Sequence, residues 1–219
     1  TESPEETERK NSEAASEAMP YRGTASDIPT DIQNLMMGKS MKEGAKISFD
    51  ELAYLKIPHY DFNGNVTEGE LVVNKKLADE VLDIFAELFE IRYPIEKMRL
   101  VDYYNASDFD SIDDNNTSAF NYRVSTAGTG SLSKHALGCA IDINPQINPY
   151  VASDGRGSHS NAAEYWSRDK SKWTSDTAKR AYIGPDSEIY YIFVTEHHWE
   201  WGGSWSGYLD YQHFQKSVN

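Results

Sequence analysis

The segment Ser133-Lys-His-Ala-Leu-Gly-Cys-Ala-Ile-Asp-Ile143 brings a histidine, a glycine and an aspartate together within one short, mostly apolar stretch. Its second half, from Ala140 to Ile143, predicts a strand. Asp142 lies between two isoleucines, and a carboxylate among apolar neighbours is costly to bury unless it is paired or binds a metal. His135 then lies on the loop that enters the strand, and Gly138 lets the backbone turn so that both side chains converge. The alternative for Asp142 is a strand aspartate whose oxygens accept backbone N–H groups.

A second motif, Asp210-Tyr-Gln-His213, supplies another imidazole and another acid near the end of the chain. Together, His135, Asp142 and His213 offer three protein ligands and leave a fourth position for water. That ligand count is typical of a catalytic zinc ion, whereas structural zinc sites are usually closed by four ligands, often thiolates. Asp210 is then free to act as a general base. Its alternative role is that of an acceptor that orients the His213 ring. The pattern indicates a metallopeptidase.

Composition narrows the class of protein. The chain has 219 residues, 39% of them hydrophobic and 12% aromatic, which predicts a packed globular body, and we expect a monomer. A net charge of −14 argues against nucleic-acid binding, which needs a clustered basic face. The single cysteine, Cys139, excludes an intrachain disulfide. We expect it to be a small core residue, with a reactive or metal-binding thiol as the alternative. No apolar run approaches the roughly 18 residues of a membrane span.

Residues 1–26 differ from the rest of the chain in being polar, acidic and nearly free of branched apolar side chains. Such a segment cannot bury enough surface to offset its ordering entropy. We therefore predict a disordered acidic tether over 1–26 and a folded domain over 27–219. A tether of this kind suits an exported protein held off a membrane anchor, so we expect an extracellular or cell-envelope location in a bacterium.

The periodicity of the remaining chain predicts an α+β fold. Apolar residues spaced by three and four predict a helix over 75–92, which Pro94 ends. Alternation predicts a strand over 97–102, and a second helix is expected after Asp186 as its N-cap. The last segment, 199–214, is rich in Trp, Gly and Tyr and predicts strands and turns. Helices and short strands mix without regular alternation, which favours α+β over a parallel α/β sheet.

The pattern Ser-x-His-x-x-Gly-x-Ala-x-Asp, followed downstream by Asp-x-x-His, resembles the signature of the M15 peptidases. This group contains D-alanyl-D-alanine carboxypeptidases and L-alanyl-D-glutamate endopeptidases. The resemblance covers most of the folded part, through Gly69–Asn74, Met98–Asp102, Asn115–Arg123, Ala140–Pro145, Asn148–Tyr150 and Trp201–Trp205. It implies a fold like that of hedgehog domains and D-Ala-D-Ala peptidases. In that fold a small antiparallel sheet is flanked by helices and carries the zinc site.

The resemblance also implies a role for each site residue. Zinc would bind His135, Asp142 and His213, with Asp210 as the base. Arg123 matches an arginine that polarises the scissile carbonyl and stabilises the oxyanion, and its alternative is a structural ion pair. Ser133 would line the substrate side of the site.

The cluster Glu196-His-His-Trp-Glu200 is the main competitor for the catalytic acid. Related peptidases place a catalytic glutamate three residues before the last histidine ligand. Neither Glu196 nor Glu200 has a histidine at that position, whereas Asp210 does, with aspartate replacing glutamate as in the endolysin-like branch.

The implied function is that of a zinc metallopeptidase that hydrolyses the D-residue-containing peptide stems of peptidoglycan. The extended core favours a D-Ala-D-Ala carboxypeptidase. The Asp-x-x-His form favours the alternative, an L-Ala-D-Glu endopeptidase. A further alternative is a zinc-retaining binding module without turnover, as in hedgehog signalling domains, but Asp210 and Arg123 argue against it.

Overall fold

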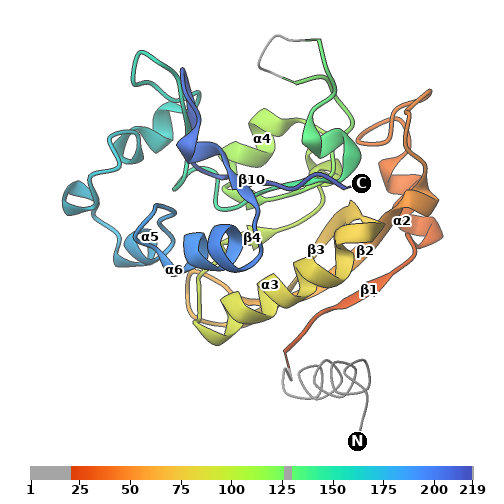
Figure 1. Cartoon of the computed structure of the whole chain (residues 1–219), viewed down its shortest axis with the longest axis horizontal. Helices are drawn as coiled ribbons and strands as arrows, with labels where there is room; N and C mark the ends of the chain where they lie inside the picture. Colours follow the sequence, from red (N-terminus) through yellow and green to blue (C-terminus); the bar gives the residue numbers. More distant parts are fainter. Residues whose placement is uncertain (1–20, 126–129, 219) are drawn as a thin grey trace, which may run out of the picture.

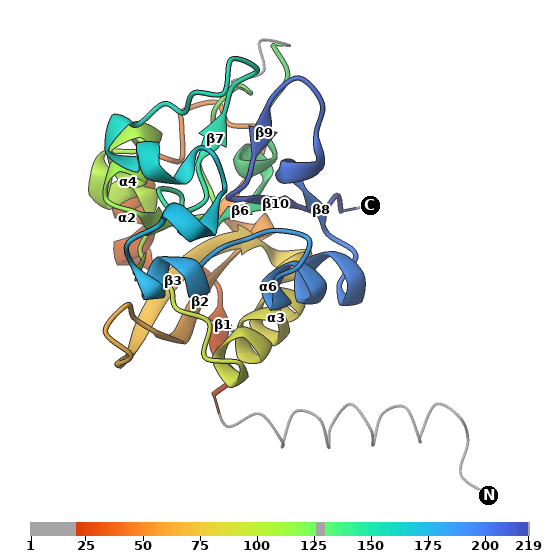
Figure 2. The ribbon, with the colours of Figure 1, turned by 90° about the vertical axis from the view of Figure 1, so that its left-hand side faces the viewer.

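The computed structural model describes residues 21–125 and 130–218, and its architecture is α+β, as predicted (Figure 1). Two antiparallel three-stranded sheets form the framework for the residues of the two motifs, with strand orders β1-β2-β3 and β6-β10-β8. The strands of the first sheet are β1 (Thr24–Ser26), β2 (Leu52–Tyr60) and β3 (Val66–Asn74). Those of the second are β6 (Ala140–Asp142), β10 (His213–Gln215) and β8 (Glu200–Trp201). Figure 2 shows the second sheet above the first, with α3 beside the first sheet.

The remaining strands and helices connect and flank these sheets. Two short strand pairs are β4 (Lys97–Met98) with β5 (Asn116–Thr117), and β7 (Tyr150–Val151) with β9 (Leu209–Asp210). The α-helices are α2 (Thr30–Met36), α3 (Ala78–Glu90), α4 (Asp108–Asp113), α5 (Asp176–Arg180) and α6 (Glu188–Tyr190). Within the described residues, no helix combines the length and apolar character needed to cross a membrane.

The predicted helix over 75–92 is confirmed as α3, preceded by a 3₁₀ turn over Lys75–Leu77. The Asn74 side chain caps this turn by accepting a hydrogen bond from the Lys76 N–H. The apolar face of α3 packs on the β2–β3 hairpin in the main core, and Val81, Ile84 and Phe85 are fully buried. Each such side chain contributes roughly 1.5–3 kcal/mol of burial free energy. Cys139 also lies in this core, and burial raises the pKa of its thiol. The prediction that Cys139 is a core residue is therefore confirmed.

Two predicted elements differ from the observed ones. The strand expected over 97–102 ends at Met98, and residues 101–104 form a 3₁₀ turn. The reason is Asp102, whose buried carboxylate accepts hydrogen bonds from the backbone N–H and the hydroxyl of Ser40. The cap of the second helix is Ser187, whose hydroxyl accepts from the Tyr190 N–H, and not Asp186. That helix continues as a π-helix over Tyr191–Glu196.

The predicted boundary between tether and domain is corrected by β1. Residues 1–20 of the predicted tether lie outside the described residues. However, Thr24–Ser26 pair with β2, and the Arg22 guanidinium forms an ion pair with Asp83 on α3. All three β1 residues are exposed, so this pairing uses backbone hydrogen bonds and needs no apolar side chains. The ordered domain therefore begins before residue 27.

Candidate metal centre

His135 lies on a 3₁₀ turn, Lys134–Leu137, whose two ends are fixed by the motif itself. At the start, the Ser133 hydroxyl accepts a hydrogen bond from the His135 N–H at 3.3 Å. At the end, Gly138 adopts a left-handed conformation with φ of 65°. Its carbonyl accepts from the Asn74 N–H at 2.8 Å, which joins the turn to the end of β3.

Asp142 and His213 meet because they are direct partners across the antiparallel β6–β10 pair. Side chains of direct partners project from the same face of a sheet. The Asp142 Oδ1 lies 3.0 Å from the His213 Nδ1, and its Oδ2 lies 3.2 Å from the His135 Nε2. Strand pairing therefore joins Asp142 to His213 across 71 residues of sequence and completes the group of three side chains.

The far nitrogen of each imidazole is occupied by an oxygen acceptor. The His135 Nδ1 lies 2.6 Å from the Ala119 carbonyl, and the His213 Nε2 lies 3.0 Å from the Gln215 Oε1. These oxygens only accept, so each far nitrogen carries the ring proton. In the neutral rings the near nitrogens, 3.2 Å apart, therefore hold lone pairs directed at one another and at the Asp142 carboxylate. A cation between the three groups would satisfy these lone pairs and the charge of the carboxylate.

A divalent metal fits this donor set. One ligand atom from each of His135, Asp142 and His213 lies within 4.8 Å of the other two, and both imidazoles are buried. Two nitrogens and a carboxylate oxygen, with the far ring nitrogens hydrogen-bonded, is a common catalytic zinc arrangement.

The electrostatics of the group point the same way. Burial lowers the pKa of His213, but the hydrogen bond and charge of Asp142 outweigh it and raise the value to about 9. Burial raises the pKa of Asp142, whereas the charges and hydrogen bonds of His135 and His213 bring it well below its usual range. The group therefore holds a proton at neutral pH in the position that a metal cation would take.

Asp210 lies on β9, beside Tyr150 of β7, at the start of the turn that leads to His213. Its Oδ1 is buried and has no hydrogen-bond partner among the described residues. Burial and the negative charge of Asp142 raise the Asp210 pKa to about 6. The alternative of Asp210 as acceptor for the His213 ring does not hold, because Gln215 occupies that place.

Close packing fixes the turn between Asp210 and His213. The Trp201 indole N–H donates to the Tyr211 carbonyl at 2.9 Å. A Cβ atom on Gly202 would lie 2.6 Å from the Asp210 carbonyl oxygen and 3.2 Å from the His213 Cβ. Only glycine lets the two segments approach this closely.

The structure places Arg123 and Ser133 side by side but gives each a structural contact. The Ser133 N–H donates to the Arg123 carbonyl at 3.0 Å. The Arg123 guanidinium forms an ion pair with Asp108, whose other oxygen accepts from the Asn121 amide. The ion pair considered as the alternative for Arg123 is therefore present. Its part in catalysis and the contact of Ser133 with substrate stay predictions.

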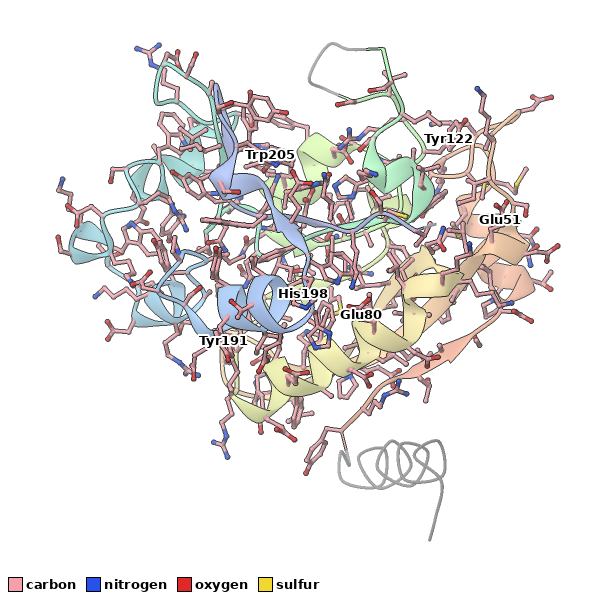
Figure 3. The ribbon with its side chains drawn as sticks, in the orientation of Figure 1. Glu51, Glu80, Tyr122, Tyr191, His198 and Trp205 are labelled. Atoms are coloured by element: carbon pink, nitrogen blue, oxygen red, sulfur yellow. The ribbon has the colours of Figure 1, made fainter. Side chains whose placement is uncertain are left out.

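Of the competing cluster, His197 lies away from the group, whereas Glu200 lies on β8 and accepts a hydrogen bond from Gln215. His197 contacts two glutamates of α3, with its Nε2 2.9 Å from the Glu87 Oε1. In the view of Figure 3, His198 lies below β10 toward α3, whereas Trp205 lies above β10. His197 therefore joins the end of the π-helix to α3, whereas His198 is exposed.

Sequence reasoning missed two partners of the imidazoles. Gln215 follows His213 by two residues on the same strand, so alternation along β10 places both side chains on one face. That spacing could have identified it once the strand was known. The Ala119 carbonyl could not be found, because any residue type offers the same backbone oxygen.

Residues 127–216 match a family model described as D-alanyl-D-alanine carboxypeptidase, of the M15 peptidases. Over this segment the chain is similar to the M15 peptidases. The M15 segment contains His135, Asp142, Asp210 and His213, whereas Arg123 precedes it. A comparison with curated proteins found no match, and neither did a comparison with solved structures.

Proposed function

We propose that this chain is a zinc-dependent D-Ala-D-Ala carboxypeptidase that acts on the peptide stems of bacterial peptidoglycan. The observation that carries the proposal is the convergence of three ligand atoms, together with the buried Asp210 oxygen that has no hydrogen-bond partner within the described part of the chain. This convergence falls within the segment that matches the M15 family model. A substrate of this kind also argues for a location at the cell envelope.

The ligand set would consist of the His135 Nε2, the His213 Nδ1 and the Asp142 carboxylate. A zinc ion held in this way supplies a Lewis acid that polarises a carbonyl group and lowers the pKa of water. A hedgehog-like fold is part of the proposal, supported by the position of the ligands on the β6–β10–β8 sheet.

Asp210 is the residue suited to move the proton. A carboxylate with a pKa of about 6 accepts a proton from the attacking water and can return it to the departing amine at neutral pH. Its Oδ1, which no described residue contacts by a hydrogen bond, has acceptor capacity for that water. Because the turn is fixed by Trp201 and Gly202, the carboxylate is held in place before substrate arrives.

Arg123 would stabilise the negative charge that develops on the carbonyl oxygen. In the structure Asp108 holds its guanidinium. The proposal therefore requires Arg123 to turn from Asp108 toward the substrate, or to use the N–H groups that Asp108 leaves free. Ser133, joined to Arg123 through the backbone, would line the same side.

The decisive experiment is mass spectrometry of zinc-loaded protein incubated with a peptidoglycan stem pentapeptide, beside a chelator-treated sample. Loss of one terminal alanine only in the zinc-loaded sample is the expected result. An internal cut between the first two stem residues would show the L-Ala-D-Glu endopeptidase instead. An untouched peptide together with bound zinc would point to the non-catalytic binding module.

A further inference from the structure

His213 and three neighbouring side chains form a closed ring of contacts at β8 and β10. The Gln215 Oε1 faces the His213 Nε2 at 3.0 Å, and the Gln215 amide group donates to the Glu200 Oε2 at 2.8 Å. The other oxygen of Glu200 accepts from the Trp205 indole N–H at 2.5 Å. The Trp205 ring closes the ring of contacts, with its centroid 5.1 Å from that of His213.

Donor and acceptor chemistry allows one orientation of this network. Glu200 is a direct cross-strand partner of Gln215, and an ionised carboxylate only accepts. The Gln215 NH₂ group must therefore face Glu200, and its carbonyl oxygen must face His213. That oxygen in turn requires a proton on the His213 Nε2, which leaves the Nδ1 lone pair directed at Asp142 and His135.

We propose that Glu200 and Gln215 are positioning residues for the metal ligand His213. The inference rests on the proposed function, because the nitrogen that they orient is the one assigned to zinc. Glu200 has no histidine three residues after it and cannot be the catalytic acid of the motif. Its role is exerted through Gln215, because one carboxylate oxygen takes the Gln215 amide while the other takes the Trp205 indole.

Single exchanges between acid and amide should break the network. In Glu200→Gln, one of the two acceptor oxygens becomes a donor, so a donor faces either Gln215 or Trp205. In Gln215→Glu, two carboxylates meet where a 2.8 Å hydrogen bond now lies. Loss of such outer contacts typically lowers metal affinity 10–100-fold, and we expect each single variant to bind zinc that much more weakly.

The double variant Glu200→Gln/Gln215→Glu should restore binding. The carboxylate at position 215 accepts from the His213 ring and from the new amide at position 200, whose carbonyl oxygen accepts from Trp205. Every hydrogen bond of the ring is then satisfied again. Independent substitutions add to within about twofold, so recovery of affinity in the double variant is a signature of direct coupling.

The experiment measures zinc affinity by competition with a colorimetric chelator, together with thermal unfolding of the zinc-free proteins. Hydrogen exchange of the His213 ring N–H, followed by NMR in the zinc-free state, provides a readout that does not need the metal. Glu196→Gln is the matched control, because Glu196 is exposed in the same segment and interacts with Glu87 instead. We expect unchanged zinc affinity in this control.

Weakened single variants and a restored double variant support the inference. Single variants that bind zinc as tightly as the unmodified protein overturn it, as does a double variant that stays as weak as the singles. If the unmodified protein takes up no zinc, the proposed function fails. The ring N–H then decides the inference separately, since equally fast exchange in all four proteins overturns it.

Discussion

The close contact between the end of β3 and the turn that carries His135 can be tested with Gly138→Ala. Gly138 has a φ of 65°, and a left-handed conformation costs an ordinary L-residue roughly 1–2 kcal/mol. An added Cβ would also lie 2.4 Å from the Asn74 nitrogen and 2.8 Å from the Val73 carbonyl carbon. Both are backbone atoms, so the turn and the strand must separate.

Separation breaks the hydrogen bond from the Asn74 N–H to the Gly138 carbonyl, now 2.8 Å long. A buried donor left without a partner costs about 1–3 kcal/mol. With the conformational cost, the free energy of unfolding should fall by about 2–5 kcal/mol. That is a large part of the roughly 5–15 kcal/mol that stabilises a typical domain. Movement of the turn should also lower zinc affinity, because His135 moves with it.

Gly155→Ala is the matched control. Gly155 has a φ of 83°, and an added Cβ there meets no atom within 4 Å among the described residues. It should therefore show only the conformational cost of about 1–2 kcal/mol, with unchanged zinc binding. Urea unfolding of the three zinc-free proteins, analysed by linear extrapolation, measures the difference. Equal losses in the two variants would refute the argument that Gly138 is needed for the close approach to β3.

Three further predictions concern the site. For pH, the His213 pKa is raised from 6.5 to about 9, so its stabilisation of the zinc-free fold is complete below pH 6.5 and lost as pH rises through 9. Thermal unfolding of the zinc-free protein should show this loss of stability, and His213→Asn should abolish the pH dependence. Zinc affinity should rise with pH up to about 9, because zinc binding displaces the His213 proton. Calorimetry in buffers of different ionisation enthalpy measures the number of protons released. For the general base, Asp210→Asn should lower kcat by about 10²–10⁴-fold. The zinc content of this variant, measured by metal analysis, should stay at one equivalent. Loss of zinc would instead assign Asp210 to the ligand set. For the oxyanion role, Arg123→Lys should lower kcat steeply, whereas Asp108→Asn should leave it unchanged in steady-state assays; equal losses in both variants would reduce Arg123 to a structural ion pair.

Prediction from the sequence succeeded where the signal was local. The helix α3 follows from apolar spacing, and Gly138 between His135 and Asp142 marks a turn whatever surrounds it. It failed where a distant partner decided the outcome. The run 97–102 alternates like a strand, but Ser40 draws the Asp102 carboxylate into the core and turns the chain. Likewise, β1 forms a strand because it pairs with the edge of β2. Its side chains are all exposed, so they show no apolar alternation that would predict a strand.

By itself, the sequence determined which residues could form the centre, because residue type limits the chemistry. His135, Asp142, His213 and Asp210 are recognisable from two short motifs, each compact enough to be local. Only the tertiary structure decided how they meet. The register of β6 on β10 places Asp142 opposite His213, and the register of β8 on β10 places Glu200 opposite Gln215. A shift of one residue would turn these side chains to the other face. Register depends on packing between segments far apart in the chain, which no local pattern encodes.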